Sequence, residues 1–214
     1  MRLGSTLTVQ EYLQQVKTTL DALNPQDIQT LADLLYRAWE RGNFVYIFGN
    51  GGSGCNATHM SEDLGKSTLR PEDLHDESRK RLRVMSLTDN LGWILAVGND
   101  VGYEDIFLQQ LMNYGREGDL VVAISGSGNS PNVLRAVDWA NRHGLVTYGL
   151  TGYQGGKLRQ IQQHGLHVPL EDMGIVESIH LTVFHWALDD VYARINRLGR
   201  YAPQGTVAGQ ERAG

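Results

Sequence analysis

The sequence is poor in the features that mark several large classes of protein. It contains one cysteine, Cys55, so no disulfide can form within the chain, as is usual in a reducing cytoplasm. No apolar run approaches the roughly 20 residues that a membrane-spanning helix needs. The start of the chain also lacks the apolar core of a secretory signal peptide. We therefore expect a cytoplasmic protein without a membrane partner.

The chain also lacks an excess of positive charge. It carries 19 Lys and Arg against 24 Asp and Glu, a net charge of −5, which argues against a broad basic surface for nucleic acid. One basic run exists, "SRKRLR" at 78–83, but the acidic "PEDLHDE" at 71–77 precedes it. Such a mixture is typical of a solvated, mobile insertion. Nucleic acid is not an expected partner.

Two amphipathic helices are predicted within residues 8–41. Thr8 and Glu11 have the spacing of a capping box, and apolar residues follow at helical intervals. Asn24 and Pro25 are typical of an N-cap and a first helical turn, and Gly42 is typical of a helix end.

Beyond residue 42 the sequence alternates between apolar runs and helix-like segments. The apolar runs lie at 44–48, 83–88, 120–125, 146–151 and 166–170, and the helix-like segments at 55–68, 91–115, 131–143, 157–163 and 175–198. Continuous apolar runs are typical of strands buried on both faces of a parallel sheet. We therefore predict a doubly wound, flavodoxin-like α/β fold with five parallel strands and helices on both faces. One domain is expected over 1–200, with the helical extension at 8–41 and a tail at 201–214.

Three glycine-rich or serine-rich loops follow predicted strands, where open parallel sheets bind ligands. They are "GNGGSG" (49–54), "SGSGNSPN" (125–132) and "TGYQGGKL" (151–158). The first loop matches neither the dinucleotide fingerprint G-x-G-x-x-G nor a P-loop. It is either an ordinary turn between a strand and a helix or a flexible loop rich in hydrogen-bond donors.

The second loop has the composition of a phosphate site. Ser130 and Pro131 predict a helix start, so the hydroxyls of Ser125, Ser127 and Ser130 are expected around free backbone N–H groups. Such a helix start binds a phosphate dianion without needing Lys or Arg. The alternative is a capped loop that holds no ligand.

Four side chains could form a metal site. His59 and Asp63 are four residues apart on one predicted helix, and Glu177 and His185 share a face of the last helix. Together they could hold zinc or a similar cation. His185 also has apolar neighbours in sequence, so a buried core histidine is an alternative.

The loops resemble, in combination, those of the SIS (sugar isomerase) domain family, and within it the phosphoheptose isomerases. The matching motifs are "GNGGSxCxAxHxxEDL", "VGNDxGxxDIF", "GREGDLVVAISxSGNSxNV", "LTGxxGGKL" and "ESIHLTVFH", within residues 8–197. The resemblance implies an enzyme that isomerises a phosphorylated sugar, most closely sedoheptulose 7-phosphate, in lipopolysaccharide or heptose biosynthesis. It also implies a homotetramer with active sites shared between neighbouring subunits.

The resemblance implies roles for particular residues. His59, Asp63, Glu177 and His185 match zinc ligands, and Asp63 and His185 would transfer protons through a cis-enediol. Phosphate and sugar contacts are implied at Asn50, Gly51, Gly52, Ser53, Asn99, Asp100, Ser125, Gly126, Ser127, Ser130 and Glu177.

Departures from the family pattern fall at reactive positions. The family usually has Glu at position 63, Gln at position 177 and Asp at position 174, where this chain has Asp63, Glu177 and Gly174. Two alternatives to an isomerase follow. Some relatives are adaptors that bind the bacterial replication initiator, but they have lost the metal-binding histidine and carboxylates. The other alternative is a module that senses sugar phosphates without turnover.

Overall fold

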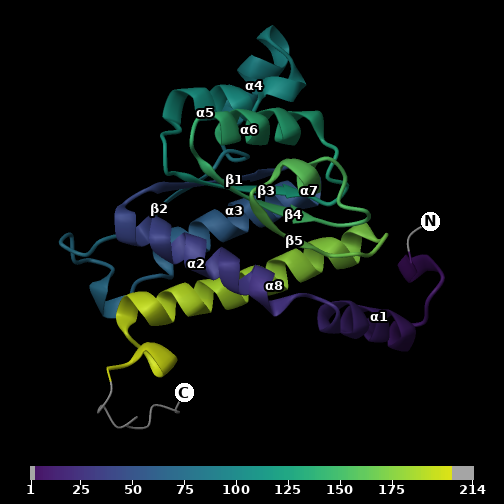
Figure 1. The fold of residues 1–214 in the computed structure, drawn as a ribbon, viewed down its shortest axis with the longest axis horizontal. Helices are drawn as coiled ribbons and strands as arrows, with labels where there is room; N and C mark the ends of the chain where they lie inside the picture. Colours follow the sequence, from purple (N-terminus) through teal and green to yellow (C-terminus); the bar gives the residue numbers. More distant parts are fainter. Residues whose placement is uncertain (1–2, 204–214) are drawn as a thin grey trace.

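The computed structural model describes residues 3–203, in which five parallel strands form one sheet (Figure 1). The strands are β1 (Phe44–Gly49), β2 (Arg83–Ser86), β3 (Leu120–Ser125), β4 (Val146–Thr151) and β5 (His164–His167). Their order is β2-β1-β3-β4-β5, and every neighbouring pair is parallel. This is the flavodoxin-like order, so the predicted fold class is confirmed.

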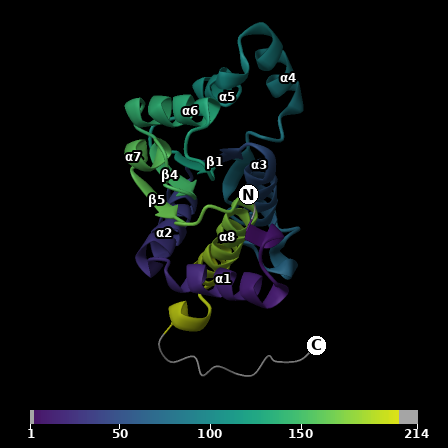
Figure 2. The ribbon, with the colours of Figure 1, turned by 90° about the vertical axis from the view of Figure 1, so that its right-hand side faces the viewer.

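Helices cover both faces of the sheet. They are α1 (Val9–Asp21), α2 (Pro25–Arg41), α3 (Gly51–Lys66), α4 (Leu91–Asp100), α5 (Leu108–Tyr114), α6 (Pro131–Arg142), α7 (Leu158–Ile161) and α8 (Met173–Asn196). In Figures 1 and 2, α2, α3 and α8 lie on one face and α5 and α6 on the other, while α4 projects away from the sheet. In residues 3–203, none of the helices combines the length and apolar character needed to cross a bilayer.

The strands are apolar throughout because each face is covered. In β1, Val45 and Ile47 join the hydrophobic cluster that includes α2, α3 and α8. The intervening Tyr46 and Phe48 join a second cluster with α5 and α6. Side chains alternate between the two faces of a strand, so a continuous apolar run supplies both clusters.

The predicted helix ends in the N-terminal extension are confirmed. Thr8 Oγ1 accepts the Glu11 N–H at 3.3 Å, and Glu11 Oε2 accepts the Thr8 N–H at 2.7 Å, which completes the capping box of α1. Asn24 Oδ1 accepts the Gln26 N–H at 3.1 Å at the start of α2. Gly42 ends that helix in the left-handed region, at φ 74°.

Three predicted element boundaries are wrong. The helix expected at 91–115 is broken into α4, a 3-10 turn (Tyr103–Asp105) and α5, because Gly102 adopts φ 147°. The last strand covers 164–167 instead of 166–170, since Pro169 has no N–H to extend the ladder. The third helix begins at Gly51 and not near residue 55. The loop "GNGGSG" is therefore largely the first turn of α3.

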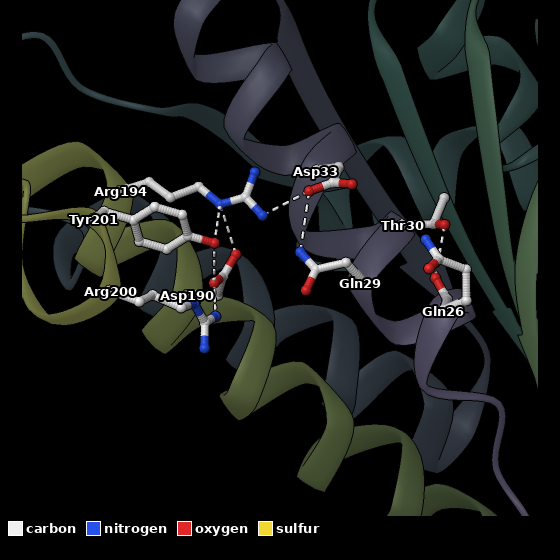
Figure 3. Close-up of polar contacts among 8 residues, drawn as sticks. All are labelled: Gln26, Gln29, Thr30, Asp33, Asp190, Arg194, Arg200 and Tyr201. Atoms are coloured by element: carbon white, nitrogen blue, oxygen red, sulfur yellow. Dashed lines mark hydrogen bonds and ion pairs between the residues drawn. The ribbon is translucent and has the colours of Figure 1, made fainter.

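The end of the described chain is tied to α8 by a buried carboxylate (Figure 3). The Asp190 side chain is fully buried, and Arg194 Nε lies 2.7 Å from its Oδ2 atom. The Tyr201 hydroxyl donates to Asp190 Oδ1 at 2.9 Å, and Arg200 is also paired with this carboxylate. Arg194 reaches Asp33 of α2 at 2.6 Å. Tyr201 belongs to a last 3-10 turn (Gly199–Tyr201), and residues 204–214 of the predicted tail lie outside the described residues.

His180 of α8 should make stability depend on pH. Its side chain is fully buried, and burial lowers its pKa from 6.5 to about 4 although its Nε2 lies 3.2 Å from the Thr151 carbonyl oxygen. The unfolded chain therefore binds more protons between these values, so stability is complete above pH 6.5 and declines as the pH falls toward 4. The loss should approach about 3 kcal/mol.

Urea unfolding of wild type and His180→Gln at pH 7 and 4.5 measures this effect. We expect a smaller pH-dependent loss in His180→Gln, and an unchanged loss in a control, His75→Gln, at an exposed position. Equal pH dependence in wild type and His180→Gln would show that His180 does not carry it.

Candidate active site

The site lies where the strand order reverses, between β1 and β3, which is the usual ligand position in such sheets. Asn50, the residue before α3, forms two reciprocal hydrogen bonds with Asn132 of α6. Each side-chain Nδ2 donates to the other residue's Oδ1 at 2.9 Å. The Tyr103 hydroxyl donates to Asn50 Oδ1 at 3.1 Å. These bonds fix the loop after β1 against the loop after β3.

The predicted serine loop closes around the start of α6. Ser125 is buried at the end of β3, and its Oγ lies 3.2 Å from Oγ of Ser130. Ser130 occupies the N-cap position before Pro131, but its hydroxyl does not bond to the helix amides. Ser127 is exposed and its Oγ accepts the Asn129 N–H at 3.3 Å. Pro131 has no N–H, and the Val133 N–H donates to Asn132 Oδ1 at 2.9 Å. The Asn132 N–H has no cap from Ser130 and, with these hydroxyls, can bind an anion.

Gly126 lies in the middle of this loop and is covered by the first residue of α8. A Cβ atom at Gly126 would overlap the Met173 side chain. The start of α8 thus lies directly beside the serine loop.

Glu177 lies against the first turn of α3 instead of among the metal ligands. Its carboxylate accepts the Ser53 N–H and occupies the space that a Cβ atom on Gly52 would need. Burial raises the pKa of Glu177, and the bond from Ser53 lowers it by a smaller amount. Ser53 itself is buried, whereas Gly51 is exposed. The Glu177 carboxylate therefore lies at the N-terminus of α3, which is the positive end of the helix dipole.

His59, Asp63 and His185 come together on the facing sides of α3 and α8. His59 Nε2 lies 3.2 Å and His185 Nε2 lies 3.7 Å from Asp63 Oδ2. All three ligand atoms lie within 4.8 Å of one another. The two imidazoles are about half exposed, at 46%, while Asp63 is 17% exposed. The histidine rings meet edge to face at 5.1 Å.

These three residues fit a zinc-like ion. Bonds of 2.0–2.1 Å in a tetrahedral site place ligand atoms about 3.3 Å apart, close to the two distances observed here. Two imidazoles and one carboxylate also form a ligand set that zinc enzymes use, with a fourth position left for water or substrate. The exposure of the imidazoles leaves that position accessible from solvent.

The structure does not bring the fourth predicted ligand to this cluster. Glu177 and His185 lie eight residues apart on α8, a rise of about 12 Å, although they share a face. Ser53 and Asp63 are separated by about 15 Å along α3 for the same reason. Within this chain the loop at the start of α3 and the His59–Asp63–His185 cluster are therefore separate.

Two further predicted sugar-binding residues lie elsewhere. Asn99 and Asp100 are exposed at the end of α4, which projects from the body of the molecule (Figure 2). The Asn99 amide donates to the Asp100 carboxylate at 2.7 Å. No hydrogen bond within residues 3–203 ties either side chain to the serine loop or to α3.

Two residues of the site were not predicted from the sequence. Asn132 is bonded to Asn50, as described above, and Asn129 Oδ1 accepts the Lys157 N–H at 3.1 Å. The second bond joins the serine loop to the "TGYQGGKL" loop. Both asparagines belong to the predicted "SGSGNSPN" motif, but their partners are distant in sequence, so only the loop and not its bonding could be found from the sequence.

Comparisons with known proteins identify the family of this chain. A family model described as the SIS domain matches residues 10–152. The chain is 37% identical over 166 residues to the phosphoheptose isomerase of Fusobacterium nucleatum, covering 78% of this chain and 81% of that protein. Among solved structures, a phosphoheptose isomerase from Francisella tularensis superimposes with a TM-score of 0.75 at 30% identity, covering 86% and 95% of the two chains. One from Neisseria gonorrhoeae has the same TM-score at 26% identity, covering 86% and 98%.

Proposed function

Since this chain belongs to the SIS domain family, with phosphoheptose isomerases among its relatives, we propose that it interconverts sedoheptulose 7-phosphate and an aldoheptose 7-phosphate. One observation carries this proposal. A loop of three hydroxyls at a helix start suits a phosphate, and a separate cluster of two histidines and a carboxylate suits the carbonyl end of a sugar. We place this reaction in the cytoplasm.

We further propose that each active site combines two subunits of a homotetramer. Glu177 and Ser53, at the sugar-loop end of α8 and α3, lie about 12 Å and 15 Å along these helices from His185 and Asp63, so in one chain the loops and the cluster lie apart. A second copy would present its His59, Asp63 and His185 to the serine loop and Glu177 of the first. Exposed apolar side chains on α1 and α4 supply surface for such an assembly, namely Val9, Leu13, Leu91 and Leu95, each more than 60% exposed.

Proton transfer would then fall to Asp63 and His185. A base removes a proton from C1 of the ketose, the C1–C2 double bond of a cis-enediol forms, and the carbonyl oxygen takes a proton. Protonation at C2 and loss of the proton on O1 then give the aldose. The Asp63 carboxylate and the His185 imidazole lie 3.7 Å apart, so both can reach one pair of adjacent carbons. A zinc-like ion held by His59, Asp63 and His185 would polarise the carbonyl group.

Turnover of sedoheptulose 7-phosphate by the purified protein tests the proposal directly. We expect aldoheptose 7-phosphate to appear, and its formation to fall sharply in Asp63→Asn, which keeps the size of the side chain but removes the base. A protein that binds sedoheptulose 7-phosphate without converting it would support the sensing function instead. Binding to the replication initiator without any turnover would support the adaptor.

Ser130→Ala tests the phosphate position. Removing this hydroxyl should weaken sugar-phosphate binding by about 1–2 kcal/mol, the scale of one hydrogen bond to a charged group. Calorimetric titration of wild type and variant measures it. Ser178→Ala is the matched control, because Ser178 is exposed and donates only to a carbonyl within α8. Unchanged affinity in Ser130→Ala would contradict the assignment.

Mixed tetramers test the shared site. A loop variant, Ser125→Ala/Ser130→Ala, and a cluster variant, His59→Ala/His185→Ala, should each have low activity alone. Co-expressed with distinct tags and purified together, they should recover activity at about a quarter of the sites, because random pairing unites an intact loop with an intact cluster. No recovery in a mixed tetramer would place each site within one subunit. Light scattering giving a mass near 23.8 kDa, that of one chain, would contradict the assembly.

A further inference from the structure

The insertion at residues 70–82 is fastened to two helices, contrary to the mobile segment expected from its sequence. Trp39 Nε1 of α2 donates to the Lys80 carbonyl at 3.2 Å, and Lys80 Nζ donates to the Glu40 carbonyl at 2.8 Å. At the other end, Arg70 donates to the Asn196 carbonyl of α8 at 3.0 Å. The insertion therefore bridges the ends of α2 and α8.

This bridge closes over a cavity of about 690 Å³. Its walls are Trp39, Leu69, Arg70, Asp73, Asp76, Ser78, Arg79, Lys80, Ile195, Asn196 and Arg197. The insertion leads into the amino end of β2, so the cavity lies at the opposite end of the sheet from the serine loop. Its volume is within the range of small-molecule sites.

The cavity is positively charged in a chain with a net charge of −5. Four cationic side chains line it against two carboxylates. Both carboxylates face the same cation, since Arg79 lies 2.8 Å from Asp73 and 3.5 Å from Asp76. The charges of Arg70, Lys80 and Arg197 are therefore not neutralised by these carboxylates.

Arg197 is the strongest indication that this cavity binds an anion. It is exposed at the end of α8, and its guanidinium makes no hydrogen bond or ion pair with any residue in 3–203. Its backbone adopts the left-handed region at φ 54°, where glycine is usual after a helix. The last carbonyls of α8 do not use the guanidinium either, because backbone N–H groups and Arg70 bond to them. The chain thus has an arginine at a position that suits glycine, and its side chain has no partner among residues 3–203.

We propose that this cavity binds a small polyanion with two or more phosphate or carboxylate groups. The guanidinium groups of Arg70 and Arg197 hold its oxygen atoms in bidentate pairs, and Lys80 adds a third positive charge. The lining provides no metal-ligand cluster and no uncapped helix start, so this site is distinct in chemistry from the serine loop.

Calorimetric titration with pyrophosphate and, separately, with tricarballylate tests the proposal. Both titrations use the Ser125→Ala/Ser130→Ala protein, so that binding at the serine loop does not contribute. We expect at least one of the two anions to bind, and its affinity to fall about tenfold in Arg197→Gln. Tighter binding of pyrophosphate indicates a phosphate ligand, and tighter binding of tricarballylate a carboxylate ligand.

Two control variants show whether the loss of affinity is specific to the Arg197 guanidinium. Arg197→Lys should retain part of the affinity, because it keeps the charge but not the planar fork. Arg142→Gln should retain all of it, since Arg142 is an exposed arginine of α6 paired with Asp138. Binding of neither anion overturns the proposal. An equal loss in Arg142→Gln and Arg197→Gln also overturns it, because that result reflects the general charge of the protein.

Discussion

We expect the double variant His59→Ala/His185→Ala to bind no zinc-like ion and to lack isomerase activity. Wild type should contain about one zinc-like ion per chain, because two imidazoles and a carboxylate converge at the required spacing. Turnover should fall by at least about a thousandfold, since the variant removes both a proton-transfer group and two of the three ligands. Metal analysis and turnover of sedoheptulose 7-phosphate measure the two effects separately.

The same variant should remain folded. Both imidazoles are 46% exposed and neither belongs to the hydrophobic clusters, so the melting temperature of the metal-free protein should change little. A double variant at exposed histidines, His75→Ala/His143→Ala, provides the control and should keep its metal and activity. The metal should also leave wild type as the pH falls, because the imidazoles and carboxylate must be deprotonated to bind it. Wild type without metal, whose melting temperature and turnover do not respond to added zinc, would refute the metal-dependent reaction.

Asp190→Ala should lower the free energy of unfolding by about 3–5 kcal/mol, the usual effect of removing one partner of a buried ion pair. The Asp190 side chain is fully buried, and Arg194, which lies beside it, is only 15% exposed. The variant would leave the Arg194 guanidinium with Asp33 as its only carboxylate partner among the described residues. It would also remove the carboxylate partner of Arg200 and of the Tyr201 hydroxyl, which still accepts from Arg194 Nε at 3.1 Å, so the last 3-10 turn should be held less tightly to α8.

Urea unfolding at pH 7 measures this loss. The control is Asp138→Ala on α6, which removes an ion pair of the same type whose two partners are 62% exposed. That change should cost less than about 1 kcal/mol, because water solvates both charges. Similar midpoints for the two variants would contradict a structural role for the buried carboxylate.

Local patterns in the sequence were sufficient to predict the sheet and part of the site. Buried parallel strands are continuous apolar runs, and the turn chemistry at Thr8, Asn24 and Gly42 marks helix ends within a few residues. His59 and Asp63 could be paired because four residues on a helix lie one turn apart. His185 joins them through a contact between α8 and α3, which the residue types suggested but helical spacing alone could not establish.

Other features depend on distances that local patterns do not contain. Glu177 and His185 share a helix face, but angular position does not reveal the rise of about 12 Å between them. The hydrogen bonds between Asn50 and Asn132 join residues 82 positions apart in the sequence. They form because β1 and β3 are adjacent strands of the sheet. The apolar spacing of residues 91–115 favours one helix, but Gly102 divides this segment. The backbone conformation of Gly102 depends on tertiary packing, which apolar spacing does not reveal.

The serine loop contains no titratable side chain between Ser125 and Ser130. Its hydroxyls and backbone amides keep the same protonation throughout the range in which proteins are stable. The ionisation of the ligand itself therefore controls how anchoring varies with acidity. A phosphate monoester changes from monoanion to dianion near pH 6, and the positive end of a helix attracts the dianion more strongly. Acidification below that value should weaken the binding of a sugar phosphate at this loop through a change in the ligand and not in the loop.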